Sequence, residues 1–201
     1  MESKRWWVEH VQPTWTIFDC GANVGYYAIL FSQLAPKGTI YAFEPTATSA
    51  MLKENLAENG AKNVVVVDLA LGATSGRKVE PIYRLWGREA ERNETEFTSV
   101  DDFVAARAIQ RVDAMKIDVD SFDFEVLVGA EQTLARDDPF VVVELNHALN
   151  LRQHSNAEAF DWLSHHGYRE ARVLEYENYV LKRAVSLADE YPGGQRFTLV
   201  F

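Results

Sequence analysis

The chain has 201 residues, of which 47% are hydrophobic and one is a cysteine, and its formal net charge is −10. A chain of this size can bury a core without disulfides or metals, so we expect a single domain over residues 1–201. The negative charge argues against a general nucleic-acid binder, which needs a basic surface to displace counterions. Cys20 cannot form an internal disulfide, and no apolar run reaches membrane-spanning length. We therefore expect a cytoplasmic protein that does not enter a membrane.

The first thirteen residues carry Trp6, Trp7, Val8 and Val11 among charged residues and end at Pro13. This pattern indicates a short amphipathic helix that packs on the domain. The alternative is that the two tryptophans line an acceptor pocket, and we favour packing. Because the first strand follows so soon, we expect any upstream segment over an acceptor site to be short or absent.

The stretch over residues 15–34 reads as a strand, a glycine loop and a helix. Gly21 would let the backbone turn sharply toward a ligand, and Gly25 would let the start of the helix pack close to the strand. The free N–H groups of the first helical turn then face a ligand above the loop. Asp19 ends the strand, where a carboxylate suits hydroxyls or a cation. The residues that we assign to ligand binding here are Asp19, Gly21, Asn23 and Gly25.

Two more strands follow. Residues 39–43 end in Glu44, about twenty residues beyond the glycine loop, where doubly wound folds place a carboxylate that accepts ribose hydroxyls. The valine run over residues 64–67 is typical of a strand buried on both faces of a parallel sheet. In doubly wound folds, the end of the third strand lies beside the adenine of a bound ligand. Asp68 and the backbone of Leu69 and Ala70 are therefore candidate adenine contacts.

Residues 73–97 are polar and contain Gly76, Pro81 and Gly87. This composition predicts an inserted loop or a short hairpin near the ligand face. Ser99 is then expected to cap a short helix.

The fourth strand, over residues 112–120, ends in two acids, Asp118 and Asp120. Because strand side chains alternate, both carboxylates would share a direction if the strand persisted that far. Ser121 is predicted to cap the helix that follows.

The fifth strand, over residues 140–144, ends in Glu144 and opens into Asn146 and His147. Strand and helix have alternated through five buried strands, which requires right-handed crossovers and predicts a three-layer α/β sandwich. Ser155, with Glu158 three residues later, is predicted to cap a helix through His166. The remaining strand candidates have no helix among them, so we expect an antiparallel edge. They lie at residues 168–174, 179–182 and 197–201.

Five segments occur in the order and rough spacing of the FkbM family of methyltransferases, which the chain resembles from Trp15 to Glu144. They are Phe18-Asp19-Cys20-Gly21-Ala22-Asn23-Val24-Gly25-Tyr26-Tyr27, Tyr41-Ala42-Phe43-Glu44-Pro45, Leu69-Ala70-Leu71-Gly72, Ser99-Val100-Asp101-Asp102 and Lys116-Ile117-Asp118-Val119. One departure is visible, because the family usually continues the last segment with Glu-Gly, where this chain has Asp120-Ser121. This exchange affects the local loop shape and bears on the choice of acceptor.

The resemblance implies a Rossmann-like class I methyltransferase sandwich, with a mostly parallel seven-stranded sheet and a terminal antiparallel strand. It implies S-adenosylmethionine as cofactor and transfer of a methyl group to a hydroxyl of a small metabolite, sugar, glycan or polyketide-type acceptor. One alternative is a non-catalytic partner protein that still binds the cofactor. A nicotinamide-dependent oxidoreductase is another, but the loop lacks the third glycine of G-x-G-x-x-G.

An alcohol needs a base, or a metal that acidifies it, before it attacks a methyl group. The residues that we predict to act on the acceptor are Asp118, Glu144, Asn146 and His147, with Asp118 also near the cofactor. His147 is either a general base or a surface histidine just past the strand. Asp118, Asp120 and Asn146 would suit Mg²⁺ or Ca²⁺ by their oxygen atoms. We favour a reaction without a metal, because Ser121 would start a helix and turn Asp120 away.

Overall fold

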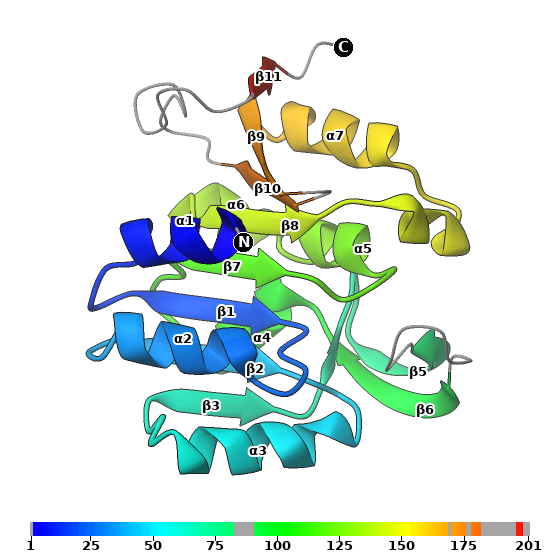
Figure 1. Ribbon diagram of the computed structural model, residues 1–201. Helices are drawn as coiled ribbons and strands as arrows, with labels where there is room; N and C mark the ends of the chain where they lie inside the picture. The colour runs from blue at the N-terminus through cyan, green and yellow to red at the C-terminus, as the bar shows by residue number, and fades with distance from the viewer. Residues whose placement is uncertain (1, 83–90, 169, 176–177, 182–195, 199–201) are drawn as a thin grey trace.

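The computed structural model describes residues 2–82, 91–168, 170–175, 178–181 and 196–198. Its main sheet has eight strands within this part of the chain, in the spatial order β11-β9-β10-β8-β7-β1-β2-β3 (Figure 1). The strands of the main sheet are β1 (Thr16–Cys20), β2 (Thr39–Phe43), β3 (Val64–Val67), β7 (Ala114–Ile117), β8 (Phe140–Glu144), β9 (Glu170–Glu175), β10 (Asn178–Leu181) and β11 (Arg196–Thr198).

Five neighbouring strands, β8, β7, β1, β2 and β3, are parallel, as the alternation of strand and helix predicts. The strand β10 runs antiparallel to β8 and to β9, and short β11 adds antiparallel to β9 at the edge. The described sheet thus contains a seven-stranded, mostly parallel core with β10 antiparallel inside it. The predicted fold class is confirmed, and β11 is an additional eighth strand.

Helices cover both faces of the sheet. Their bounds are α1 (Glu2–His10), α2 (Tyr26–Leu34), α3 (Thr48–Glu58), α4 (Val100–Ala106), α5 (Asp123–Val128), α6 (Glu131–Asp137), α7 (Asn156–His165) and the 3-10 helix η1 (His147–Arg152). In Figure 1, α1 and α2 lie in front of the strands, whereas α4, α5 and α6 lie behind them. Two caps lie where the sequence predicts them. The Ser99 and Ser155 hydroxyls accept the backbone N–H of Asp102 and Glu158.

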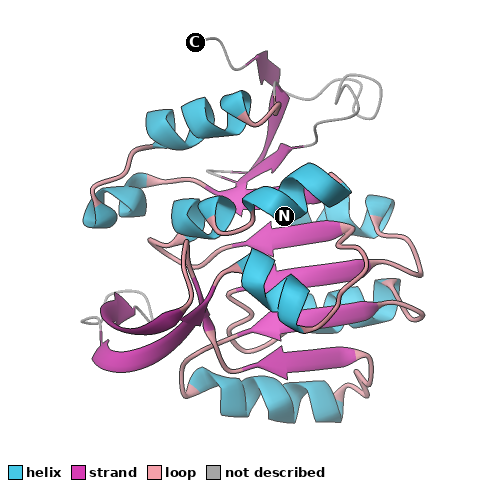
Figure 2. Ribbon diagram, turned by 180° about the vertical axis from the view of Figure 1, so that it is seen from behind, coloured by secondary structure: helices cyan, strands magenta, loops and turns pink. Residues whose placement is uncertain are grey.

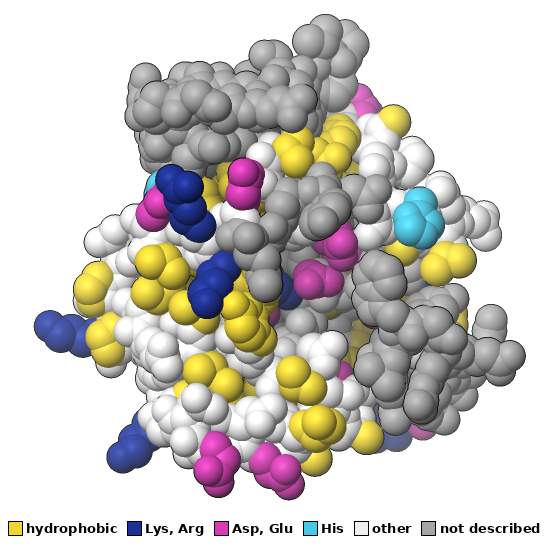
Figure 3. Space-filling model, in the orientation of Figure 1, with side chains coloured by type: hydrophobic (Ala, Val, Ile, Leu, Met, Phe, Trp, Pro, Cys, Tyr) yellow, Lys and Arg dark blue, Asp and Glu magenta, His cyan; other side chains and the backbone are white. Residues whose placement is uncertain are grey.

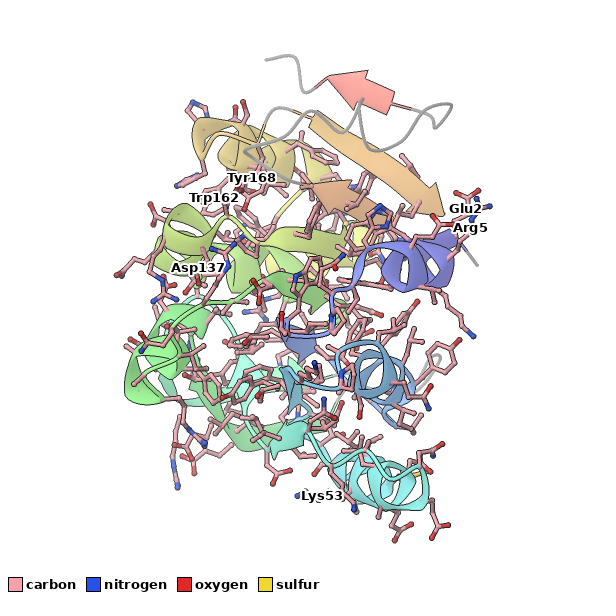
Figure 4. All side chains as sticks on the ribbon, turned by 90° about the vertical axis from the view of Figure 1, so that its left-hand side faces the viewer. Glu2, Arg5, Lys53, Asp137, Trp162 and Tyr168 are labelled. Carbon is pink, nitrogen blue, oxygen red and sulfur yellow. The ribbon has the colours of Figure 1, made fainter. Side chains whose placement is uncertain are left out.

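The alternation of strand side chains divides the core between these two faces. Ile17 of β1 packs with Trp7 of α1 and Phe31 of α2, whereas the next residue, Phe18, packs with Phe103 of α4 on the other face. Figure 4, viewed from the end at which the parallel strands begin, shows Trp162 and Tyr168 together beside α7, and Arg5 on the outer side of α1. The predicted packing helix at the N-terminus is confirmed, because Trp6 and Trp7 are both buried.

A second, three-stranded sheet lies to one side of the main sheet (Figure 2). It consists of β4 (Ala70–Leu71), β5 (Gly76–Ile82) and β6 (Glu91–Thr98), with β5 and β6 antiparallel. This hairpin confirms the insertion predicted over residues 73–97, part of which lies outside the described residues.

Two local predictions are wrong. The strand β3 is at the edge of the described sheet, and three of its four valines are only partly buried, so β-branched composition does not mark burial on both faces here. Ser121 caps no helix, because α5 starts at Asp123 with Phe122 before it, and a separate helix, α6, follows. Among the described residues, no helix is long and apolar enough to cross a bilayer.

Candidate functional site

A cavity of about 210 Å³ lies at the carboxyl ends of the parallel strands, the edge at which open α/β sheets bind ligands. Acidic side chains gather around a hollow on the side of the molecule where the strand arrows of Figure 1 end (Figure 3). The cavity is lined by Gly21, Asn23, Phe43, Glu44, Pro45, Thr46, Thr48, Leu69, Ala70, Leu71, Ile82, Phe97, Asp118, Val119, Asp120 and Phe122. Six of the residues predicted from the sequence are among them: Gly21, Asn23, Glu44, Leu69, Ala70 and Asp118.

The glycine loop is fixed to two neighbouring strands. The backbone N–H groups of Gly21 and Ala22 donate to the carbonyl oxygen of Phe43 at the end of β2. Gly21 has φ +83°, and a Cβ there would lie 1.9 Å from the backbone oxygen of Asp118. A side chain at Gly21 would therefore strike the end of β7 before it reached a ligand.

Gly25 has φ +95° and stands directly before α2, in the left-handed conformation that favours glycine. A Cβ at this position would lie 2.6 Å from the Leu52 side chain of α3. Gly25 is thus needed for close packing of two helices, whereas the sequence pattern predicts packing of a helix on a strand. Asn23, at φ 49°, turns its backbone N–H toward the neighbouring loop.

Glu44 is nearly buried and joins the two loops that bound the cavity. Its Oε2 accepts the Asn23 backbone N–H at 3.0 Å, and its Oε1 accepts both the backbone N–H and the hydroxyl of Thr46. A carboxylate has about four acceptor positions, so about one remains on Oε2 for a ligand. The position of Glu44 at the cavity agrees with a contact to a ribose hydroxyl.

Apolar side chains form the opposite wall. The hairpin supplies Ile82 and Phe97, and Phe122 packs on Phe97 at a ring-centroid distance of 5.3 Å. The guanidinium carbon of Arg152 lies 3.7 Å from the centroid of the Phe122 ring, and Arg152 also pairs with Glu80 of β5 at 3.2 Å. The wall can hold a flat aromatic group such as adenine, next to the backbone of Leu69 and Ala70.

Asp68 does not line this cavity. Its carboxylate pairs with the Lys53 ammonium group at 2.8 Å and accepts the Ser49 hydroxyl, both from α3. Figure 4 shows Lys53 at the outer edge of α3, far from α7. This placement does not support the predicted contact between the Asp68 side chain and adenine. The sequence near Asp68 could not show this, because the partners of Asp68 come from α3.

A buried ion pair lies beneath the glycine loop. Asp19 of β1 and Lys116 of β7 are side by side in the parallel register, and the Lys116 Nζ lies 3.6 Å from Asp19 Oδ1. The Asp19 side chain is 0% exposed, and neither of its oxygens has a hydrogen-bond partner among the described residues. Burial raises the pKa of Asp19, and the nearby Lys116 opposes this effect. Lys116 was not predicted as a site residue from the sequence. The signal that could have found it is a lysine within an otherwise apolar, buried strand.

The other partner of Lys116 is Asp118, whose Oδ2 lies 3.1 Å from its Nζ. Asp118 and Glu144 follow the paired residues Ile117 and Val143, so they lie beside each other at the ends of β7 and β8. The Lys116 ammonium group lowers the pKa of Asp118. Burial and the neighbouring Asp118 raise the pKa of Glu144 to about 7, and Asn146 opposes this effect. Three of the residues predicted to act on the acceptor, Asp118, Glu144 and Asn146, therefore lie close together.

Asp120 does not share the direction of Asp118. The strand β7 ends at Ile117, and Asp120 takes a left-handed backbone conformation with φ 60°. Its carboxylate still lines the cavity, where burial and the charges of Asp118 and Glu44 raise its pKa to about 6. The predicted alternation fails because the strand stops three residues earlier than the sequence pattern suggests.

His147 is exposed at the start of η1 and does not line the cavity. Asn146 caps η1, with its Oδ1 accepting the Ala148 backbone N–H at 2.7 Å. In the described part of the chain, no group of three or more His, Cys, Asp or Glu residues is placed to hold a metal ion. Independence from metals stays a prediction.

The residues present fit S-adenosylmethionine, the cofactor that the sequence resemblance implies. Glu44 keeps about one acceptor position for a ribose hydroxyl, and the apolar wall suits adenine. Asp19 lies beneath the glycine loop, where it is buried, pairs with Lys116 and does not line the cavity. The cavity thus matches the ribose and adenine parts of the cofactor.

Similar folds occur among solved methyltransferases. The structure of methyltransferase FkbM from Methylobacillus flagellatus KT matches with a TM-score of 0.63 and 14% identity over 86% of this chain. This match covers 44% of that protein, so the present chain spans less than half of its length. The precorrin-6y C5,15-methyltransferase from Geobacter metallireducens GS-15 matches with a TM-score of 0.56 and 17% identity, covering 92% of this chain and 88% of that one.

A third structure, SMU.1697c from Streptococcus mutans, was solved in complex with S-adenosylhomocysteine. It matches with a TM-score of 0.58 and 10% identity, over 90% of this chain and 95% of that one. At such identities the likeness shows the fold alone, and no curated protein matches the sequence. The methyltransferase FkbM domain model, however, matches residues 19–170, which is well over half of the chain. The chain belongs to the FkbM family of methyltransferases, whose cofactor is S-adenosylmethionine.

Proposed function

We propose that the protein is an O-methyltransferase that methylates a hydroxyl group of a small molecule or a glycan. The observation that carries this proposal is the neighbouring pair of Asp118 and Glu144 at the ends of β7 and β8, of which Asp118 lines the cavity. A carboxyl group with a pKa of about 7 is suited to take a proton from a hydroxyl at neutral pH. We also propose a reducing, cytoplasmic setting, supported by the buried free thiol of Cys20.

The cofactor, when bound, supplies a methyl group on a positively charged sulfur. We propose that Glu44 binds the ribose hydroxyls and that the glycine loop, with Asp19 buried beneath it, binds the methionine part. Phe97 and Ile82 shield one side of the cavity from water. Methyl transfer is an in-line displacement, which is favoured when the reacting atoms are aligned and water is excluded.

On the acceptor side, we propose that the ionised Glu144 removes the hydroxyl proton while Asp118 orients the hydroxyl group. Asn146 acts on Glu144 in the opposite direction to burial and lowers its pKa. His147 is exposed and separate from this carboxyl pair, so we propose Glu144 rather than His147 as the base.

The cavity rim also bears on the type of acceptor. Its charged lining residues are all acidic: Glu44, Asp118 and Asp120. Phosphate or carboxylate groups on the acceptor would be repelled by these side chains, and so would a nucleic-acid backbone. We therefore propose an uncharged, hydroxyl-bearing acceptor.

The test is methyl transfer from S-adenosylmethionine to a panel of sugars, glycans and polyketide-type alcohols, with carboxylated and phosphorylated analogues alongside. We expect turnover with an uncharged alcohol that persists after exhaustive chelation. Asp118→Asn is expected to lower turnover about a hundredfold or more with little change in cofactor affinity.

Two results would contradict this proposal. If a chelator abolishes the activity and Mg²⁺, Mn²⁺ or Ca²⁺ restores it, a metal ion activates the hydroxyl, and the mechanism based on the carboxyl pair is wrong. Tight binding of S-adenosylhomocysteine without turnover on any alcohol of the panel would favour the non-catalytic partner protein.

A further inference from the structure

Lys116 connects the two halves of the site. It lies on β7, its side chain is 8% exposed, and its Nζ contacts Asp19 beneath the glycine loop and Asp118 at the cavity. The ring of Tyr27 from α2 covers it, with its centroid 5.2 Å from the Nζ. A buried ammonium group is costly without partners, and these two carboxylates compensate it.

The shorter of the two contacts points toward the acceptor. Lys116 Nζ lies 3.1 Å from Asp118 but 3.6 Å from Asp19. The Asp118 side chain is 45% exposed, so this contact joins a buried cation to a group at the cavity. A lysine that only neutralised Asp19 would not need a second carboxylate. Lys116 has one in Asp118, which lies just after the end of β7.

We propose that Lys116 is a positioning residue of this site, which holds Asp118 as a fixed carboxylate so that the neighbouring Glu144 is the group that takes the acceptor's proton. This proposal rests on the proposed function, because it assigns roles within the same carboxyl pair. In the step itself, the hydroxyl O–H bond breaks, its proton moves to a Glu144 oxygen, and the hydroxyl oxygen forms the new bond to the methyl carbon.

The surroundings explain why the roles divide in this way. Lys116 faces Asp118, Asp19 and Tyr27, whereas Glu144 faces mainly Asp118 and Asn146. Further off, Asp120 and Glu44 add negative charge on the cavity side, and the buried Asp123 of α5 interacts with both Asp118 and Glu144. Asp118 is therefore next to the cation, and Glu144 is next to an anion. A proton shared by the pair is held on Glu144.

The test is a carbon-13 NMR titration of the carboxyl groups in the protein without acceptor. In Lys116→Met, both titration steps of the Asp118–Glu144 pair should move to higher pH, by about one unit or more, whereas Lys116→Arg should move them little. If Lys116→Met does not fold, the same titration is made with the double variant Asp19→Asn, Lys116→Met. This variant removes both charges of the buried pair.

Asp118→Asn provides an independent check that leaves the buried pair of Asp19 and Lys116 in place. Because Asp118 raises the pKa of Glu144, this variant should move the Glu144 titration down toward its ordinary value. A Glu144 titration unchanged in Asp118→Asn, or pair titrations unchanged in a folded Lys116→Met, would overturn the assignment.

Kinetics separate this role from a merely structural one. For an accepted alcohol, kcat/KM of Lys116→Met at pH 7 should fall about tenfold, and most of this loss should disappear at pH 9, where the pair is fully ionised. A loss that is equal at all pH values would indicate a structural role. If no alcohol is methylated while the titrations shift as expected, the proposed function fails and the effect of Lys116 on the pair stands.

Discussion

Glu44 illustrates how a single carboxylate serves both the fold and the ligand. Three of its acceptor positions are used by Asn23 and Thr46, and about one faces the cavity. The sequence pattern places an acid here but does not show that it also fastens two loops. Its loss should therefore affect the ligand contact and the shape of the loops together.

We predict that Glu44→Ala weakens binding of S-adenosylhomocysteine about ten- to a hundredfold. A hydrogen bond to a charged group contributes roughly 1.5–3 kcal/mol, which corresponds to this range. Titration calorimetry measures the affinity, and the exposed Glu54→Ala on α3 is the matched control. Equal affinity in both variants would exclude the ribose contact.

The second prediction at this scale concerns pH. Glu144 must be ionised to accept a proton, so kcat/KM should fall about tenfold for each pH unit below its pKa of about 7. The activity therefore rises as the pH increases through neutrality. Glu144→Gln should abolish this limb of the profile together with most of the turnover. A limb centred near pH 4.5 in the unmodified enzyme would show that another group acts as base.

Among the structural elements, the loop between β1 and α2 is limited by its neighbours rather than by the ligand. Gly21→Ala should destabilise the protein by about 2–5 kcal/mol, because it combines a left-handed backbone with a clash against the Asp118 carbonyl oxygen. Urea unfolding measures the change. The control is Gly60→Ala, at φ +64° with no atom within 4 Å of the added Cβ, which isolates the backbone cost of about 1–2 kcal/mol.

If the two glycine variants lose equal stability, the close approach of the loop to β7 has no energetic weight. If Gly21→Ala is the less stable one, as we expect, the end of β7 must shift to accommodate it. The position of Asp118 then changes as well, so the loop and the carboxyl pair form one unit.

The hairpin is held over the cavity by Arg152, which pairs with Glu80 and stacks on Phe122. We predict that Arg152→Met increases amide hydrogen exchange in β5 about tenfold and weakens S-adenosylhomocysteine binding a few-fold, because its partly buried ion pairs with Glu80 and with Glu125 of α5 are both lost. Arg77→Met is the control, since its pair with Glu94 on the same hairpin is exposed. Similar exchange in both variants would show that other contacts hold the hairpin.

At the scale of the whole molecule, α1 closes one face of the sheet. Trp7 is fully buried and packs edge-on against Phe31 of α2, at a ring-centroid distance of 4.7 Å. We predict that Trp7→Ala lowers the free energy of unfolding by about 3–5 kcal/mol, whereas Val8→Ala, on the exposed side of α1, changes it by less than about 0.5 kcal/mol.

The affinity for S-adenosylhomocysteine should stay within about twofold in folded Trp7→Ala, because this residue packs in the core and does not line the cavity. A variant that is as stable as the parent but loses affinity or turnover would support the alternative in which the tryptophans line an acceptor pocket.

Much of the fold follows from local sequence. The caps at Ser99 and Ser155, the glycine loop and the position of Glu44 at the end of β2 lie where the sequence predicts them. Each depends on the conformational preferences of a few neighbouring residues, or on the repeated strand–helix order. Such features carry a signal within a short window, because capping hydrogen bonds and left-handed turns are local.

The candidate site depended on which strands became neighbours and in what register. The parallel register places Asp19 beside Lys116, and the adjacent ends of β7 and β8 bring Asp118 to Glu144. A shift of one residue would turn these side chains to the opposite face, and no local pattern specifies such a shift. The sequence by itself determined the strand–helix order and the residue types at the strand ends. Only the tertiary structure decided that Lys116 joins them, because packing between distant segments sets the register.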